Sequence, residues 1–289
     1  MKFQFPIFLL ITTSLSHLIH AENAGSKQVS EDARTLAVMT FNIRYDNPND
    51  RNPWKDRKGE VAQVIQTADV VGLQEAKKHQ IDQLVPNLKG YAWFGVGRDD
   101  GQNSGEHTCI FYRKDRIQLI EQDTFWLSET PAKPGSRSWD SSLPRIVTWG
   151  KLRDKVSCKE FYAFNTHFDH RGQVARQESA KLIVERVGEV AEGSPVIVMG
   201  DFNTRENSVP YNTLVGSLKD ARYLSGKPTI GPRVTTTSWT ELKDRPSPID
   251  YIFVNPLVNI LQAENVGTTF RELYPSDHLP VIALITFTE

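Results

Sequence analysis

Apolar residues recur along the chain with two different spacings. Three segments carry them three or four positions apart, the pattern that predicts amphipathic helices, at residues 58–68, 80–88 and 173–191. Other segments are short runs of apolar, β-branched and aromatic residues, and these predict strands. The predicted strands cover residues 36–45, 70–74, 91–96, 108–112, 117–126, 146–152, 160–167, 195–199, 249–254 and 281–287.

The order of these elements indicates the fold class. The chain runs β-α-β-α, then through a meander of strands, then α-β, and finally through a strand-rich end. Two mixed sheets packed face to face with helices outside, an α/β architecture of the α+β kind, accommodate this order. A Rossmann sheet does not fit, because it needs regular βαβ alternation and a glycine-rich first turn. No long polar linker or fixed repeat follows residue 35, so we predict one domain over residues 36–289.

The first 35 residues differ from the rest of the chain. Residues 1–21 combine Lys2, an apolar stretch over residues 3–15 and Ala21 at a plausible cleavage position, which is typical of a secretory signal peptide. The apolar stretch is short for a membrane anchor and no later run approaches a span, so we expect a secreted or periplasmic protein without stable membrane insertion. Residues 22–35 are polar and predict a flexible leader.

Charge and cysteine content limit the partners and covalent links. The chain has 34 Lys and Arg against 35 Asp and Glu, a formal net charge of −1. Proteins that hold long nucleic acids by broad electrostatics carry a basic excess, so long duplex DNA is not favoured and a phosphate partner must be met by a local site. Export would permit a disulfide between Cys109 and Cys158, but a free buried thiol is the more common state for a strand cysteine such as Cys109. We expect a monomer.

Polar residues cluster where apolar strands end or begin. They are Asn42, Glu75, His167, Asp201, Asn203, Asp250, Asp277 and His278. Each alone is a weak signal, because a strand-end Asp more often caps a turn than performs catalysis. As a set, the oxygen-rich side chains suit Mg²⁺, with Mn²⁺ or Ca²⁺ as alternatives. Hydrolysis of a phosphate ester needs these groups: carboxylates, a hard cation and histidines.

At these positions the sequence resembles the endonuclease/exonuclease/phosphatase superfamily, the DNase I-like proteins, and in particular its exported bacterial members. The resemblance covers residues 36–289, with all matching blocks in the family's order. These blocks are Thr40-Phe41-Asn42-Ile43, Leu73-Gln74-Glu75, Asn165-Thr166-His167, Gly200-Asp201-Phe202-Asn203, Ile249-Asp250-Tyr251-Ile252 and Ser276-Asp277-His278-Leu279-Pro280. The resemblance implies a four-layer αββα sandwich of two mixed sheets, which agrees with the order of elements above.

The resemblance also implies roles at the metal. Glu75 would be the main Mg²⁺ ligand, and Asn42 would lie beside it and bind the ion directly or through water. Asp277 would assist at the metal side.

Further implied roles concern the reacting phosphate. Asp201 would orient or deprotonate the attacking water, and Asn203 would hold that water or a phosphoryl oxygen. His278 would contact the scissile phosphate, held in position by Asp250. His167 would contact the phosphate from the opposite side.

Two further positions match the family more loosely. Glu106 sits where DNase I-like members place a carboxylate against the equivalent of His167. Arg145 resembles the family's phosphate-facing arginine before a strand, where a guanidinium binds two phosphate oxygens at once. Beside the motifs, Trp54 and Trp139 either pack loops onto the sandwich or form a lip that stacks on the substrate.

Three functions remain open from the sequence. The first, which the sequence favours over the others, is an exported, divalent-metal-dependent phosphodiesterase, either a nuclease or an enzyme acting on a smaller diester. The second is a phosphomonoesterase acting on an extracellular phosphorylated small molecule or sugar. The third, a non-catalytic binding module, is disfavoured because Glu75, Asp201 and His278 are all present. The substrate class is therefore a phosphate ester, and its identity stays open because fold does not determine reaction.

Overall fold

The computed structural model describes residues 31–245 and 247–288. The predicted signal peptide, residues 1–21, and residues 22–30 of the predicted leader lie outside the described residues. The end of the leader forms a single helical turn, α1 (Glu31–Arg34). None of the helices in the described ranges combines the length and apolar character that crossing a bilayer requires.

The described residues form two six-stranded sheets, both mixed. In order across the first sheet, the strands are β13 (Val258–Asn265), β14 (Val281–Phe287), β1 (Leu36–Asn42), β2 (Val70–Gln74), β6 (Ile110–Arg113) and β4 (Tyr91–Phe94). The second sheet has the order β11 (Lys219–Asp220), β12 (Asp250–Val254), β10 (Val196–Asp201), β9 (Glu160–His167), β8 (Ile146–Asp154) and β7 (Ile117–Trp126). The parallel pairs are β1 with β2 and β9 with β10, and the other neighbours are antiparallel.

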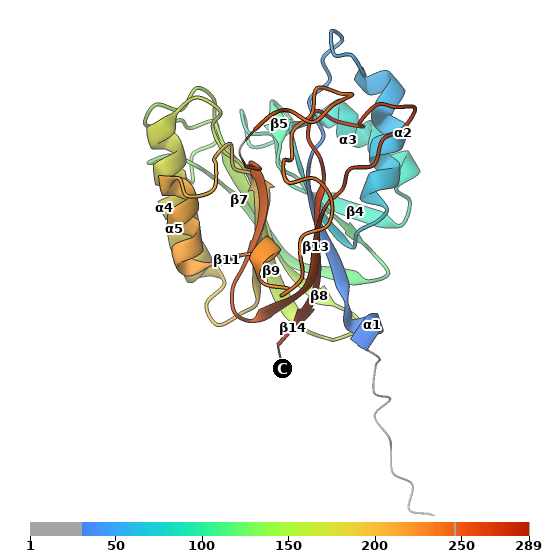
Figure 1. Ribbon diagram of the computed structural model, residues 1–289. Helices are drawn as coiled ribbons and strands as arrows, with labels where there is room; N and C mark the ends of the chain where they lie inside the picture. The colour runs from blue at the N-terminus through green and yellow to red at the C-terminus, as the bar shows by residue number, and fades with distance from the viewer. Residues whose placement is uncertain (1–30, 246, 289) are drawn as a thin grey trace, which may run out of the picture.

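Helices cover both outer faces of this pair of sheets (Figure 1). On one side, α4 (Gln173–Val190) and α5 (Val209–Ser217) share an apolar cluster with the second sheet. On the other side, α2 (Trp54–Ile65) and α3 (Lys78–Leu84) share a cluster with the first sheet. The remaining elements of the described residues are short: β3 (Ala76–Lys77), β5 (Glu106–His107), η1 (Val85–Asn87) and η2 (Ala221–Tyr223). The predicted four-layer αββα sandwich is therefore confirmed.

Local pattern predicted most of the longer elements but missed two of them, together with the short β3, β5, β11 and η2. The predicted strands at 117–126, 160–167 and 281–287 match β7, β9 and β14. Helix α5 was missed because its nine residues bury only Pro210, Tyr211 and Leu214, too few to show a helical period. Strand β13 was missed because its pairing register shifts between Ile260 and Gln262, which interrupts the alternation of buried and exposed side chains. Both Cys109 and Cys158 are free.

Alternation along each strand divides its side chains between two clusters. In β1, Leu36 and Val38 pack into the core between the sheets, whereas Met39 and Phe41 pack toward α2. The inward row of β1 continues past Val38 with polar residues and ends at Asn42, which is fully buried. The space between the sheets is therefore apolar along most of its length and polar at the end where β1 stops.

A buried amide links the two sheets near this polar end. Asn165 of β9 donates from Nδ2 to the carbonyls of Leu73 (2.8 Å) and Cys109 (3.0 Å), on the first sheet's side. Its Oδ1 accepts from Gln74 Nε2 at 2.6 Å. The position opposite must be glycine, because a Cβ at Gly72 would lie 2.7 Å from the Asn165 side chain.

We expect Asn165→Ala to destabilise the protein by about 2–3 kcal/mol, because it leaves buried carbonyls without a donor. The free energy of unfolding in urea measures this loss. Asn259→Ala, on an exposed position of β13, is the matched control and should change stability by less than about 0.5 kcal/mol. Equal effects of the two substitutions would contradict a structural role for the amide link.

Candidate active site

Strand register places three predicted site residues in one row. In the second sheet, Asp201 of β10 pairs with His167 of β9 on one side and with Asp250 of β12 on the other. Side chains at paired positions of neighbouring strands share one face. All three are buried, so the end of the second sheet presents two carboxylates and an imidazole to the first sheet.

The first sheet supplies the opposing residues. Asn42, at the end of β1, donates from Nδ2 to Glu75 Oε1 and to Asp201 Oδ2, both at 3.0 Å. Its Oδ1 accepts from the backbone N–H of Arg44 at 2.9 Å. The amide oxygen is therefore engaged, and Asn42 in this arrangement bridges carboxylates from the two sheets. The role of direct metal ligand that the resemblance allowed for Asn42 stays a prediction.

Three residues of the site have a left-handed backbone. The φ angles are 57° at Arg44, 59° at Glu75 and 45° at Asn203. Non-glycine residues adopt this conformation at a cost, so neighbouring contacts must hold it. The backbone N–H of Asn203 donates to Asp201 Oδ1 at 2.9 Å, and Glu75 Oε2 accepts from the Tyr45 N–H at 3.1 Å. The loops thus keep these side chains directed into the site at the expense of local backbone strain.

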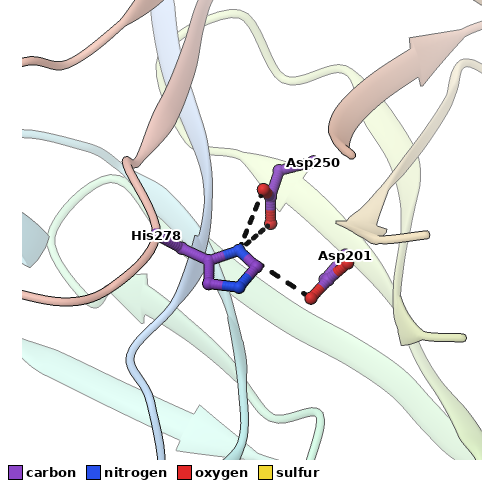
Figure 2. Close-up of side chains that lie close together, drawn as sticks. All are labelled: Asp201, Asp250 and His278. Atoms are coloured by element: carbon purple, nitrogen blue, oxygen red, sulfur yellow. Dashed lines mark hydrogen bonds and ion pairs between the residues drawn. The ribbon is translucent and has the colours of Figure 1, made fainter. Parts of the chain in front are cut away.

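His278 and Asp250 form a charged pair at the centre of the site (Figure 2). His278 Nδ1 lies 3.1 and 3.0 Å from the two Asp250 oxygens, and 3.8 Å from Asp201 Oδ2. Thr235 donates its hydroxyl to Asp250 Oδ2 and fixes that carboxylate. Burial alone would lower the pKa of His278, but Asp250 and Asp201 raise it to about 10. His278 is therefore a cation at neutral pH whose Nε2 remains available.

Asp201 and Glu75, which come from different sheets, have pKa values shifted in opposite directions. Burial, followed by the charge of Asp250, raises the pKa of Asp201 to about 7. Burial would also raise the pKa of Glu75, but His278, Asn42 and the Tyr45 amide together hold it below its usual value. At neutral pH, Glu75 is therefore a fixed anion, whereas Asp201 can exchange a proton.

His167 differs from His278 because cations dominate its surroundings, although its Nε2 also lies 3.5 Å from Asp201 Oδ2. Burial, followed by the charges of Arg145 and Arg98, lowers the pKa of His167 well below its usual value. Asn203 Nδ2 lies 3.1 Å from His167 Nε2, so this ring nitrogen accepts from the amide. His167 is a neutral imidazole with its other nitrogen protonated.

Arg145 is a buried guanidinium that retains free donors. It is 4% exposed, and its Nε and Nη1 have no hydrogen-bond partner among the described residues. Its Nη2 lies 3.0 Å from His170 Nδ1, and its Nε lies 3.5 Å from Asp169 Oδ2. Asp169 also accepts from the Ser142 N–H and hydroxyl, which fixes the loop before Arg145. Buried, unpaired N–H groups are a ready receptor for phosphate oxygens.

Glu106 has a different partner from the one the resemblance implied. Its carboxylate accepts from both Nη atoms of Arg98, at 2.6 and 3.2 Å. In the part of the chain that the structure describes, no hydrogen bond or ion pair joins Glu106 to His167. Burial raises the pKa of Glu106. The pairing places a salt bridge, instead of a His-Glu contact, on this side of the site.

These side chains surround one cavity of about 480 Å³. The lining residues are Arg44, Tyr45, Glu75, Glu106, Leu143, Arg145, His167, His170, Asp201, Asn203, Asp277 and His278. Eight of the ten residues predicted from the sequence are among them. The other two, Asn42 and Asp250, lie behind the lining and hydrogen-bond to Asp201 and His278 respectively.

Several contributors were not among the predicted site residues. Arg44 and Tyr45 follow Asn42 directly, and Asp169 and His170 follow His167, so adjacency to a motif was the available signal. Arg98 had no such signal, because it lies in a turn without a motif. Its contribution arises from the pairing with Glu106.

The donor set fits a divalent cation on the Glu75 side of the cavity. Glu75 is ionised, and Asp277 Oδ1 is buried with no hydrogen-bond partner among the described residues. Hard cations prefer such carboxylate oxygens. Asp201, Asp250 and His278 also offer ligand atoms within 4.8 Å of one another. Because His278 Nδ1 already binds Asp250, an ion at that position would have to replace this contact.

Known proteins resemble this chain over most of its length. A solved structure from Bacteroides vulgatus, described as an endonuclease/exonuclease/phosphatase, is 39% identical and superposes with a TM-score of 0.84, covering 88% of this chain and 99% of the other. A mannosyl-6-phosphatase from Bacteroides thetaiotaomicron is 36% identical with a TM-score of 0.83, covering 87% of this chain and all of the other.

More distant relatives include Nocturnin of Drosophila melanogaster, 26% identical over 280 residues. That match covers 81% of this chain but 42% of Nocturnin, so the chain spans less than half of that relative. A family model also matches residues 39–278, which contain all the site residues described above. The chain belongs to the endonuclease/exonuclease/phosphatase family.

Proposed function

We propose that this protein is a divalent-metal-dependent phosphomonoesterase that uses Mg²⁺ and acts on a phosphorylated sugar or similar small molecule. The observation that carries the proposal is the 480 Å³ cavity, in which the free donors of Arg145 and the His278 cation face the Glu75 and Asp277 carboxylates. A cavity of this size accommodates a small ligand. The mannosyl-6-phosphatase, 36% identical, supports a sugar monoester.

The residues have separate roles in the proposed hydrolysis. Glu75 and Asp277 would hold the cation, which when bound neutralises charge on the phosphoryl oxygens. Asp201, with a pKa near neutrality, orients the attacking water and accepts its proton as the water oxygen bonds to phosphorus and the P–O bond to the leaving group breaks. The departing alkoxide takes up a proton from solvent water and leaves as an alcohol. His278 and Arg145, which both line the cavity, stabilise the negative charge on the phosphoryl oxygens.

Phosphodiester hydrolysis, the function that ranked first from the sequence, is the second candidate. A neighbouring cavity of about 690 Å³ shares Glu106 with the first and contains Lys77, Lys78 and Arg98. It offers space for a second ester group. In either case, the predicted signal peptide leads us to propose that the enzyme acts outside the cytoplasm, and we retain the monomer as a proposal.

A substrate panel separates the two candidates. With Mg²⁺, we expect phosphate release from mannose 6-phosphate and p-nitrophenyl phosphate, and little or none from bis-p-nitrophenyl phosphate or plasmid DNA. The reason is that the terminal phosphate of a monoester is a dianion and fits into the cavity as the end of the molecule. A diester carries a second group on its phosphate, which needs additional space. Turnover of the diesters alone would reject the monoester proposal and select the second candidate.

Removal of the cation should abolish turnover. We expect EDTA to eliminate activity and Mg²⁺ or Mn²⁺ to restore it. Glu75→Gln should lower kcat/KM by about 10²-fold or more, the scale of losing one electrostatic contact to the transition state. Glu185→Gln, exposed on α4, is the control and should remain fully active. Activity that persists in EDTA would exclude the proposed metal dependence.

The His278–Asp250 pair should be needed for the chemical step. We expect His278→Ala to lower kcat by about 10²–10⁴-fold, because the cation that stabilises the phosphoryl oxygens is lost. Asp250→Asn should also lower kcat, since it removes the charge that keeps His278 protonated. Asp115→Asn, on an exposed turn, serves as the control. Full turnover by a folded His278→Ala protein would disprove this assignment.

A further inference from the structure

Arg57 of α2 is a cation enclosed by two indole rings. Its side chain is fully buried, and its guanidinium carbon lies 5.0 Å from the Trp54 ring centroid and 5.3 Å from that of Trp239. Its hydrogen bonds in the described structure go to backbone carbonyls: Nη1 donates to Ile43 and Pro275, and Nη2 to Arg44. No carboxylate among the described residues hydrogen-bonds to this charge.

The three carbonyls belong to segments that are far apart in the chain. Ile43 and Arg44 follow β1 and lead away from Asn42, whereas Pro275 lies two residues before Asp277. The Arg57–Pro275 contact, at 3.1 Å, spans 218 residues of sequence. A second tie runs in parallel, because the Ser276 hydroxyl donates to the Asn42 carbonyl at 2.7 Å. Arg57 therefore joins the loop that carries Asp277 to the end of β1.

The same contact controls the backbone beside Glu75. The Arg44 carbonyl accepts from Arg57 Nη2 at 2.8 Å and from Gln80 Nε2 at 3.1 Å, which holds Arg44 in its left-handed conformation. The next residue, Tyr45, donates its backbone N–H to Glu75. Arg57 thus supports both carboxylates proposed to bind the cation.

The charge of Arg57 is costly in this location. A buried cation without a bonded carboxylate opposes folding. Burial lowers the pKa of Arg57 to about 10, and Asp277, Asp50 and Glu75 act in the opposite direction through space. The residue is therefore charged at neutral pH. An apolar side chain at this position would supply no donors to the carbonyls of Ile43, Arg44 and Pro275. The fork of donors, not the packing between the indole rings, therefore connects Arg57 to the site.

We propose that Arg57 is a positioning residue that holds Glu75 and Asp277, from the two ends of the domain, at the separation that binds a divalent cation. This inference rests on the proposed metal-dependent function. Arg57 does not line the cavity. Its contacts join the segment after β1, whose Tyr45 amide holds Glu75, to the loop before β14, which carries Asp277.

Binding of Mn²⁺ alone to the full chain tests the inference without substrate. Electron paramagnetic resonance of free Mn²⁺ measures its dissociation constant. We expect Arg57→Lys and Arg57→Gln to weaken binding by about 10- to 100-fold, the range found when groups supporting metal ligands are lost. Lysine keeps the charge but cannot reach three carbonyls. Thermal unfolding and circular dichroism report whether each variant is folded.

Arg222→Lys is the matched control. Arg222 is also buried, lies 4.6 Å from the Tyr251 ring centroid and hydrogen-bonds to Asp220, away from the cavity lining. This variant should lose stability and keep the wild-type affinity for Mn²⁺. Ser276→Ala removes the hydrogen bond to the Asn42 carbonyl, and also an acceptor for the His278 backbone N–H at 3.3 Å, without a change in charge. If the Arg57 variants do not fold, this variant tests whether Mn²⁺ binding needs the loop before β14 to be joined to the end of β1, and we expect it to weaken binding by several-fold.

The outcomes separate the inference from the proposed function. Wild-type Mn²⁺ binding with weaker binding in the Arg57 or Ser276 variants supports the positioning role. Wild-type affinity in a folded Arg57→Lys protein would overturn it while leaving the metal-dependent function intact. Equal weakening by Arg222→Lys would also overturn it, because general destabilisation would then explain the loss. No Mn²⁺ binding by the wild type would reject both.

Discussion

The amide of Asn42 is the contact on which the site depends, because it lies between carboxylates that belong to different sheets. Glu75 follows the first sheet and Asp201 ends a strand of the second, and both accept from the same nitrogen. Two carboxylates that share one amide nitrogen repel each other unless donors or cations compensate their charge. The amide supplies two donors without adding charge, so the sandwich can close around the acidic groups that the proposed reaction needs.

Electrostatic asymmetry follows from what each residue faces inside the cavity. His278 faces Asp250 and Asp201 and remains protonated, whereas His167 faces Arg145 and Arg98 and remains neutral. The two imidazoles line the same cavity and both lie near Asp201, but the other charged groups around them differ. His278 is therefore a fixed cation and His167 a neutral ring that forms hydrogen bonds. Asp201, which lies between them, is the group that can exchange a proton near neutral pH.

Backbone strain and the burial of a charge accompany this arrangement, and the surrounding structure compensates for them. Left-handed backbone at Arg44, Glu75 and Asn203 is held by side-chain contacts, and the Arg57 cation is held by carbonyls and indole rings. Such strain persists only where the surroundings over-determine it. The two sheets provide that rigidity, because their apolar inner faces lock the strands that end at the site.

Strand ends were the most predictable part of the molecule. Apolar runs in the sequence located the strands, and polar residues stand where these runs end or begin; the family motifs added their roles. His167 and Asp201 end β9 and β10, Glu75 follows β2 and His278 precedes β14, and all four line the cavity. Helix α5 and strand β13 were not found, because one is too short and the other is interrupted by a register shift.

Sequence therefore determined which residue types lie at the strand ends, since the alternation of side chains and the motifs are local properties of the chain. Only the tertiary structure decided how those residues interact. The pairing of Glu106 with Arg98, the free donors of Arg145 and the carbonyl contacts of Arg57 all depend on which segments pack together. The charges of His167 and His278 depend on the same packing, because burial and neighbouring charges, not residue type, determine a pKa inside a protein.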